Sequence, residues 1–225
     1  MIDLYTWATP NGRKISIALE ELGIPYTVHS INIFEGHQTE PEFTAISPNQ
    51  KIPAIVDKET GIQLMESGAI LLYLADKTGK LMPRGKSRYW EIVEWLMWQM
   101  AGLGPMLGQV HHFVRFNKGK SVYAEERYLK EARRLYAVLD QRLADRPYLV
   151  GDEYSIADIS AWPWVSRFEF QTIDLAEFPS VLDWYLRIAQ RPAVQSGYAI
   201  PVPESVPIPS PSPSPSPSPS PSPSP

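Results

Sequence analysis

The chain has 225 residues, of which 44% are hydrophobic, and it carries a net charge of −4 at pH 7 and no cysteine. The negative net charge argues against a surface that binds nucleic acids or anionic membranes in general. The chain also contains no apolar run of about 18 residues, the length that would predict a transmembrane helix. Without cysteine, disulfides, thiolate–zinc sites and a cysteine nucleophile are excluded, so any thiol chemistry must use the sulfur of a ligand.

Residues 1–78 predict a small α/β domain. The start of the chain lacks the basic and apolar regions of a secretory signal, so we expect a cytoplasmic protein. Thr9 is suited to cap a helix that begins at Pro10, and Gly23 is suited to end it. Periodicity predicts strands at 2–6, 26–33, 54–57 and 62–65 and helices at 10–22, 41–46 and 67–76. This order is typical of a mixed sheet with helices on its faces.

Residues 79–86 predict a linker, and residues 87–200 predict an all-helical domain. Ser155 and Asp158 predict a capping box at the start of one helix. Two apolar stripes indicate long helices, one formed by Trp90, Val93, Met97 and Met100 and the other by Leu129, Ala132, Leu135, Tyr136, Leu139 and Leu143. Five tryptophans are expected in the core or at an interface: Trp90, Trp95, Trp98, Trp162 and Trp164.

The last segment, residues 201–225, has a different composition. Its prolines all stand at odd positions, and Ser-Pro repeats from Ser210 to Pro225. Such a segment cannot bury apolar surface, so we expect a disordered, solvated tail. The odd spacing also excludes the Pro-x-x-Pro pattern that adaptor domains bind.

Three motifs of the first domain carry a resemblance to a known family. Residues 50–57 predict a proline turn before a short buried strand, and Glu66-Ser67 places an acid and a hydroxyl at the tip of a helix. Together with residues 9–12 (Thr-Pro-Asn-Gly) they resemble the glutathione site of the Nu-class glutathione transferases. That class contains bacterial glutathione-dependent disulfide-bond oxidoreductases and is related to fungal prion-type homologues. The same resemblance extends to residues 1–5, 46–49, 68–74, 102–109, 111–113, 155–159 and 162–164.

The resemblance implies a thioredoxin-like α/β N-terminal domain, with a cis bond before Pro53, followed by an all-α helical bundle. It implies a homodimer that takes reduced or oxidised glutathione as substrate. We expect no metal, nucleic acid or membrane among its partners. Adjacent histidines such as His111 and His112 point about 100° apart on a helix, which disfavours a shared metal.

The resemblance also implies the residues of the site. Thr9 and Asn11 would contact the thiol at a helix N-terminus, where the dipole favours a thiolate. Neither side chain is a base at neutral pH, so hydrogen bonds and the dipole would stabilise the glutathione thiolate. The expected contacts to the rest of glutathione are Gln38, Lys51, Ile52, Pro53, Glu66, Ser67 and Arg127. The expected acceptor pocket is formed by Trp7, Met106, His111 and Phe113, and relatives usually carry another residue at position 7.

The predicted function is the reduction of small or mixed disulfides by thiol–disulfide exchange, with glutathione supplying the attacking thiolate. A transferase that conjugates glutathione to electrophiles would use the same thiolate site, so this alternative stays open. A non-enzymatic binding module on a transferase scaffold is the third hypothesis, because a fold does not determine a function. Tyr5 precedes the end of the first strand, and we expect it to pack in the core.

Overall fold

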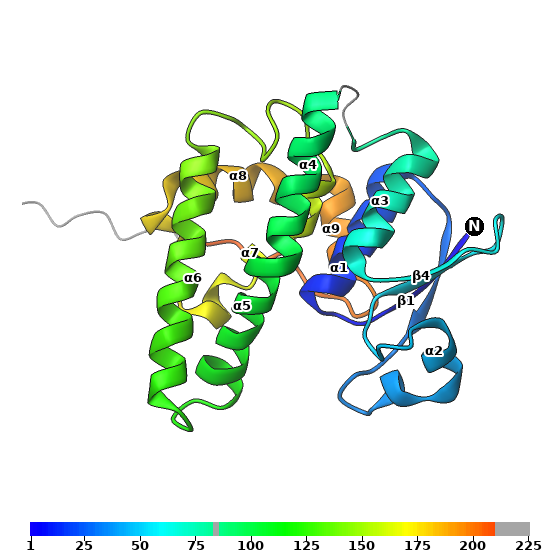
Figure 1. Cartoon of the computed structure of the whole chain (residues 1–225), viewed down its shortest axis with the longest axis horizontal. Helices are drawn as coiled ribbons and strands as arrows, with labels where there is room; N and C mark the ends of the chain where they lie inside the picture. Colours follow the sequence, from blue (N-terminus) through cyan, green and yellow to red (C-terminus); the bar gives the residue numbers. More distant parts are fainter. Residues whose placement is uncertain (83–85, 210–225) are drawn as a thin grey trace, which may run out of the picture.

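The computed structural model describes residues 1–82 and 86–209 (Figure 1). Within these ranges, four strands form one mixed sheet in the order β2-β1-β3-β4. Strand β1 (Ile2–Thr6) is parallel to β2 (Tyr26–Ser30), and β3 (Ala54–Asp57) is antiparallel to both β1 and β4 (Gln63–Met65). Tyr5 pairs with Ala54, so the end of β1 adjoins the start of β3. The loops at residues 7–9 and 51–53 therefore emerge at the same end of the sheet.

Three α-helices accompany the sheet: α1 (Pro10–Leu22), α2 (Pro41–Ile46) and α3 (Ser67–Thr78). Both predicted ends of α1 are confirmed, because the Thr9 hydroxyl accepts the backbone N–H of Gly12 and Gly23 ends the helix with a left-handed φ of 64°. The segment before α2 contains a short 3₁₀ helix, η1 (His37–Thr39).

The two faces of the sheet contribute to separate apolar clusters, because successive strand residues point to opposite sides. Ile2 and Leu4 belong to the main core, which also includes residues of α1 and α3. Tyr5 packs against the smaller cluster around Phe43 of α2, and its ring stacks on His29 with centroids 4.5 Å apart. The expected packing role of Tyr5 is thereby confirmed. Figure 1 shows α1 and α3 between the sheet and the C-terminal helices, with α2 on the other side.

From Lys86 to Tyr198 the described chain is mostly helical. Its elements are α4 (Lys86–Trp98), the π-helical turn η2 (Gln99–Leu103), α5 (Gly104–Val110), the π-helical turn η3 (His111–Phe116), α6 (Val122–Leu143), α7 (Ile156–Val165), the 3₁₀ turns η4 (Phe168–Gln171) and η5 (Leu175–Glu177), α8 (Pro179–Ala189) and α9 (Pro192–Tyr198). The predicted class, a thioredoxin-like α/β part followed by a helical part, is confirmed. Of the helices in residues 1–82 and 86–209, none combines the length and hydropathy that a bilayer crossing requires.

Helix α7 is the centre of the helical part, and all its residues are buried. The predicted capping box of Ser155 and Asp158 is present at its start. Helix α9 packs closely on α1, since a Cβ at Gly197 would lie 2.6 Å from the Cα of Ile17. This close packing joins the end of the helical part to the first helix of the α/β part.

One predicted stripe is not the buried face of its helix. Ile92, Leu96 and Leu103 are fully buried along α4 and η2, whereas Trp90 and Met97 are 65% and 46% exposed. Both stripes are apolar and helically spaced, so periodicity does not distinguish them. Trp90 therefore does not belong to the core, and only an interface role remains as a prediction for it, while Trp162 and Trp164 are buried as expected.

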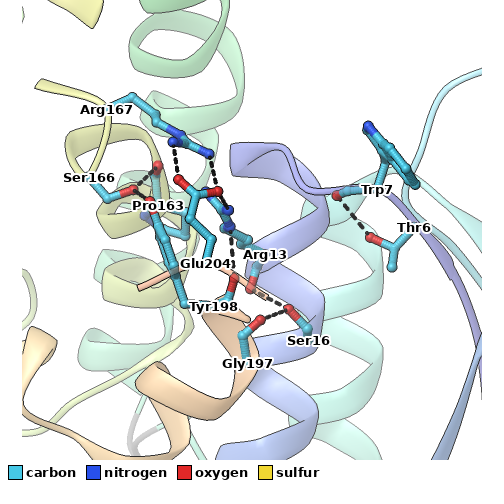
Figure 2. A network of polar contacts seen from close by, with 10 residues as sticks. All are labelled: Thr6, Trp7, Arg13, Ser16, Pro163, Ser166, Arg167, Gly197, Tyr198 and Glu204. Carbon is cyan, nitrogen blue, oxygen red and sulfur yellow. Dashed lines mark hydrogen bonds and ion pairs between the residues drawn. The ribbon is translucent and has the colours of Figure 1, made fainter. Parts of the chain in front are cut away.

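Residues 201–209 differ from the predicted solvated tail. Glu204 forms ion pairs with Arg13 of α1 and with Arg167, which follows α7 (Figure 2). The Tyr185 hydroxyl donates to the carbonyl of Pro207 at 2.6 Å. The contact arises because Arg13 is fully buried and needs a counter-charge. The Ser-Pro repeat at 210–225 lies outside the described residues.

Candidate functional site

A cleft lies at the sheet end where β1 leads to α1 and where β3 begins. It consists of three adjoining cavities of about 150, 300 and 300 Å³. Asn11 lines all three, Ile52 lines two, and Glu66 lines two. On the side of the helical part, the cleft is closed by Met100 of η2 and Trp164 of α7. We call this space the Asn11 cleft.

The start of α1 presents two hydrogen-bond donors to the cleft. The indole Nε1–H of Trp164 donates to Asn11 Oδ1 at 3.0 Å. Because the indole N–H can only donate a hydrogen bond, the Asn11 atom that faces it must be the amide oxygen. In residues 1–82 and 86–209 the Nδ2 group of Asn11 has no acceptor, which leaves it for a ligand. The Thr9 oxygen accepts the Gly12 N–H at 3.2 Å, so the Thr9 hydroxyl proton is still available for donation.

The turn before β3 presents backbone groups. The Ile52–Pro53 bond is cis, as the resemblance implied. Neither the N–H nor the C=O of Ile52 has a hydrogen-bond partner in the described part of the chain. Gln38 of η1 lines the same cavity, and its Oε1 atom is buried and has no partner among the described residues. The exposed Lys51 lines two of the cavities. These groups suit an extended, peptide-like ligand.

The start of α3 forms another wall of the cleft. Glu66 precedes the helix with a φ of 70°, a left-handed value that is uncommon for a residue with a Cβ. Ser67 is the first residue of α3, and its side chain is almost fully buried. The free N–H groups of a helix start favour an anion such as a carboxylate, and the Glu66 carboxylate is suited to an ammonium.

A lysine lies beneath Ser67. The Lys14 side chain is fully buried, and its Nζ donates to Gln99 Oε1 at 2.7 Å and to Ser67 Oγ at 3.2 Å, with Met100 Sδ 3.5 Å away. Burial lowers the pKa of Lys14 to about 7, and the charge of Glu66 opposes this shift only in part. The site therefore contains a buried amine whose hydrogen-bond partners are all neutral.

His111 lies behind Trp164, with ring centroids 5.6 Å apart. Burial, together with the charge of Arg167, lowers the pKa of His111 to about 4. The Gln171 amide nitrogen lies 3.1 Å from His111 Nε2, and its oxygen accepts from Tyr136. His111 Nε2 therefore accepts a hydrogen bond from Gln171, and the ring is neutral at physiological pH. Such a ring supports Trp164 and does not serve as an acid near neutral pH.

The structure brings together most, but not all, of the predicted site residues. The Asn11 cleft contains eight of them: Thr9, Asn11, Gln38, Lys51, Ile52, Pro53, Glu66 and Ser67. Met106 and Arg127 line a different cavity of about 690 Å³ on α5 and α6. Trp7, His111 and Phe113 line none of these cavities. Phe113 instead stacks on Tyr128, with centroids 5.5 Å apart.

Among the cleft residues that the sequence reasoning did not place in the site are Lys14, Gln99, Met100 and Trp164. Trp164 was expected in the core or at an interface, and Met100 on a helical stripe. Lys14 stands three positions after Asn11, which places it on the same side of α1, but a lysine on a helix is usually exposed. In the described residues, no group of three or more His, Cys, Asp and Glu side chains could hold a metal ion.

Comparison with known proteins identifies relatives over most of the chain. Residues 8–77 match the family model for the glutathione S-transferase N-terminal domain, and residues 123–187 match the one for the C-terminal domain. The chain is 50% identical over 198 residues to the disulfide-bond oxidoreductase YfcG of Escherichia coli K12, covering 86% of this chain and 92% of that protein.

Two solved structures are also similar. A glutathione transferase from Burkholderia graminis, with two glutathione molecules bound per subunit, superposes with a TM-score of 0.85 at 42% identity, over 89% of this chain and 88% of that one. A glutathione transferase from Pseudomonas putida, with one glutathione disulfide bound per subunit, gives 0.84 at 41% identity, over 89% and 91%.

Proposed function

Because this chain belongs to the glutathione S-transferase family, we propose that it binds glutathione in the Asn11 cleft and uses the bound thiolate to reduce small or mixed disulfides. The chain is an enzyme of that family. The finer activity is supported by the name of the E. coli relative, a disulfide-bond oxidoreductase, and by the glutathione disulfide bound to the P. putida relative. It is also supported by the chemistry of the cleft.

In the proposed binding mode, each part of glutathione meets a group of the matching kind. The free backbone groups of Ile52 pair with the cysteinyl residue of the ligand, as an added strand would. The γ-glutamyl carboxylate binds at the start of α3, near Ser67, and its ammonium pairs with Glu66. Gln38 and Lys51 bind at the glycine end. The thiol then lies at the start of α1, beside Thr9 and Asn11.

The proposed reaction has two exchange steps. The bound thiolate attacks one sulfur of the disulfide substrate, so that a new S–S bond forms, the old one breaks, and the other half leaves as a thiolate that takes a proton from water. A second glutathione thiolate then attacks the mixed disulfide, which releases glutathione disulfide and the second thiol. Two glutathione molecules together supply the two electrons. The protein contributes a helix dipole and hydrogen bonds that lower the pKa of the thiol.

The observation that carries this proposal is the amide of Asn11. It lies at the N-terminus of α1, lines every cavity of the cleft, and has its oxygen occupied by Trp164, so its Nδ2 group is presented to a ligand. A chain without cysteine needs a donor of this kind to hold a foreign thiolate.

The test is turnover of hydroxyethyl disulfide with glutathione by the wild type, by Asn11→Ala and by a matched control, Asn117→Ala. Asn117 lies between η3 and α6 and lines none of the cavities of the cleft. We expect the wild type and the control to turn over alike, and Asn11→Ala to be slower by about 10-fold or more, because a hydrogen bond to a charged group is lost. Absence of turnover above background in the wild type would refute the proposal.

Conjugation of electrophiles is the second candidate, and a chloronitrobenzene substrate separates it from disulfide reduction. The residues predicted for the electrophile side, Trp7, Met106, His111 and Phe113, do not line the cleft. We therefore expect the rate with the small disulfide to exceed the conjugation rate.

We further propose that the protein is a cytoplasmic homodimer and belongs to the Nu class. Its two domains would span residues 1–78 and 87–200. The exposed apolar face of α4, which includes Tyr89, Trp90 and Met97, supports a contact between two copies. Arg127 lies away from the Asn11 cleft, so its expected contact with glutathione needs a second copy of the chain. Light scattering on the eluting protein tests the dimer, and a monomer at micromolar concentration would contradict it.

A further inference from the structure

Lys14 is a buried, ionisable amine that has no counter-ion among the residues the structure describes. It donates to Gln99, contacts Ser67 and lies near a thioether, and in the described part of the chain no carboxylate pairs with it. Buried charges in proteins are normally paired, because an isolated charge is strongly disfavoured in a low-dielectric interior. The position is thus suited to a charge that arrives with a ligand.

The neighbouring groups point to an anion. The Gln99 side chain lines the same cavity as Lys14, and within residues 1–82 and 86–209 its buried Nε2 group has no hydrogen-bond partner. Lys14 donates to the oxygen of Ser67, and the Ser67 hydroxyl itself donates to Met100 Sδ at 3.6 Å, a weak acceptor that a carboxylate oxygen would replace. The start of α3, whose N–H groups also favour negative charge, completes the arrangement. Donors therefore converge here from α1, α3 and η2.

We propose that Lys14 is the counter-charge for the γ-glutamyl carboxylate of glutathione, and that binding of this carboxylate is coupled to protonation of Lys14. This inference rests on the proposed function, because it takes glutathione as the occupant of the cleft. Lys14 acts through Ser67 and by its charge, so it is a positioning residue for the ligand.

Few other charges face Lys14. Glu66, ahead of α3, is the group whose charge favours its protonated form. The other titratable side chains on α1 and on the elements packed against it have partners elsewhere or lie apart: Arg13 with Glu204, Glu20 with Tyr26, Glu21 with Arg191, Asp3 with Lys58, Tyr73 and Lys77 with Asp57, Asp158 with Trp184, Tyr198 with Ser166, Tyr5 stacked on His29, and Asp76 exposed near the far end of α3. A carboxylate beside Ser67 would therefore change the local field substantially.

The direction of the effect follows from linkage. In the free protein, burial holds the pKa of Lys14 at about 7, so the side chain is mostly protonated at pH 6 and mostly neutral at pH 8. A bound carboxylate favours the protonated form, so binding takes up a proton at pH 8 and little at pH 6. If only the protonated form binds well, the affinity falls by up to about 10-fold between these pH values.

The experiment is calorimetric titration with S-methylglutathione, which has the carboxylates and ammonium of glutathione but no thiol to titrate. Heats measured in buffers of different ionisation enthalpy give the protons taken up at pH 6, 7 and 8. The proteins are the wild type, Lys14→Met and the exposed-loop control Lys118→Met. We expect the wild type and the control to take up on the order of 0.5–1 proton more than Lys14→Met at pH 8, and an equal number at pH 6.

Equal proton uptake by all three proteins at pH 8 would overturn the inference and leave the proposed function standing. Failure of S-methylglutathione to bind the wild type at every pH would overturn both. If Lys14→Met does not fold, the wild type alone gives the answer through NMR of isotope-labelled lysines. The lysine resonance that titrates near neutral pH should shift to a higher midpoint with the ligand, and an unchanged midpoint would overturn the inference.

Discussion

Replacing Lys14 by methionine is expected to change how the stability of the protein responds to pH. The substitution keeps a long, flexible side chain in the buried site but removes the group that binds a proton. Every other titratable group is retained, so the difference between the two stability curves isolates Lys14.

The size of the effect follows from the two pKa values of Lys14, about 7 in the folded protein and the ordinary 10.5 in the unfolded chain. Between these values the unfolded state binds a proton that the folded state lacks, so the free energy of unfolding rises with pH, by about 1.4 kcal/mol per pH unit. Because the pKa of Lys14 is lowered in the folded protein, its contribution to the free energy of unfolding is fully present above pH 10.5. This contribution is lost as the pH falls toward 7. From pH 7 to pH 9 the gain from Lys14 is about 2 kcal/mol, and from pH 6 to pH 7 it is well below 1 kcal/mol.

Urea unfolding of both proteins at pH 6, 7, 8 and 9, followed by tryptophan fluorescence, measures this difference. The free energy of unfolding of the wild type should rise by about 2 kcal/mol relative to Lys14→Met between pH 7 and pH 9. Parallel curves over this range would refute the reasoning, because they would mean that Lys14 titrates in the folded protein as it does in the unfolded chain.

Three further substitutions test other contacts. Trp164→Phe removes the donor that orients Asn11 and should lower kcat/KM for disulfide reduction by roughly 3- to 10-fold, with the rate recovered only by residues that donate a hydrogen bond there. Glu204→Gln removes the charge that compensates the buried Arg13; since Glu204 is partly exposed, urea unfolding should show a loss of about 1–2 kcal/mol, and an unchanged midpoint would contradict the ion pair's role. Gly12→Ala would place a Cβ 2.2 Å from a backbone oxygen in the loop before α1, so a loss of about 1–3 kcal/mol in the same assay is expected, and wild-type stability would refute this steric argument.

The sequence predicted the part of the site that lies at the ends of secondary-structure elements. Thr9 and Asn11 start α1, Ile52 precedes β3, and Glu66 precedes α3. These positions have local signals, namely a cap, a proline turn and a helix start, and the strand order of the sheet brings the three ends together. Lys14 has no such signal, because burial of a helical lysine depends on what packs against it.

The sequence by itself determined the order of the elements in the α/β part, the caps of α1 and α7, and the dependence of any thiol chemistry on a ligand, because each of these follows from neighbouring residues or from composition. The tertiary structure alone decided which stripe of α4 is buried and which partners the buried charges have. Lys14 meets Gln99, which is 85 positions away, and Arg13 meets Glu204, which is 191 positions away. Such pairs arise from packing between segments that are far apart in the sequence. No local pattern encodes them, since the residues around each side chain indicate its own secondary structure and not its neighbour in space.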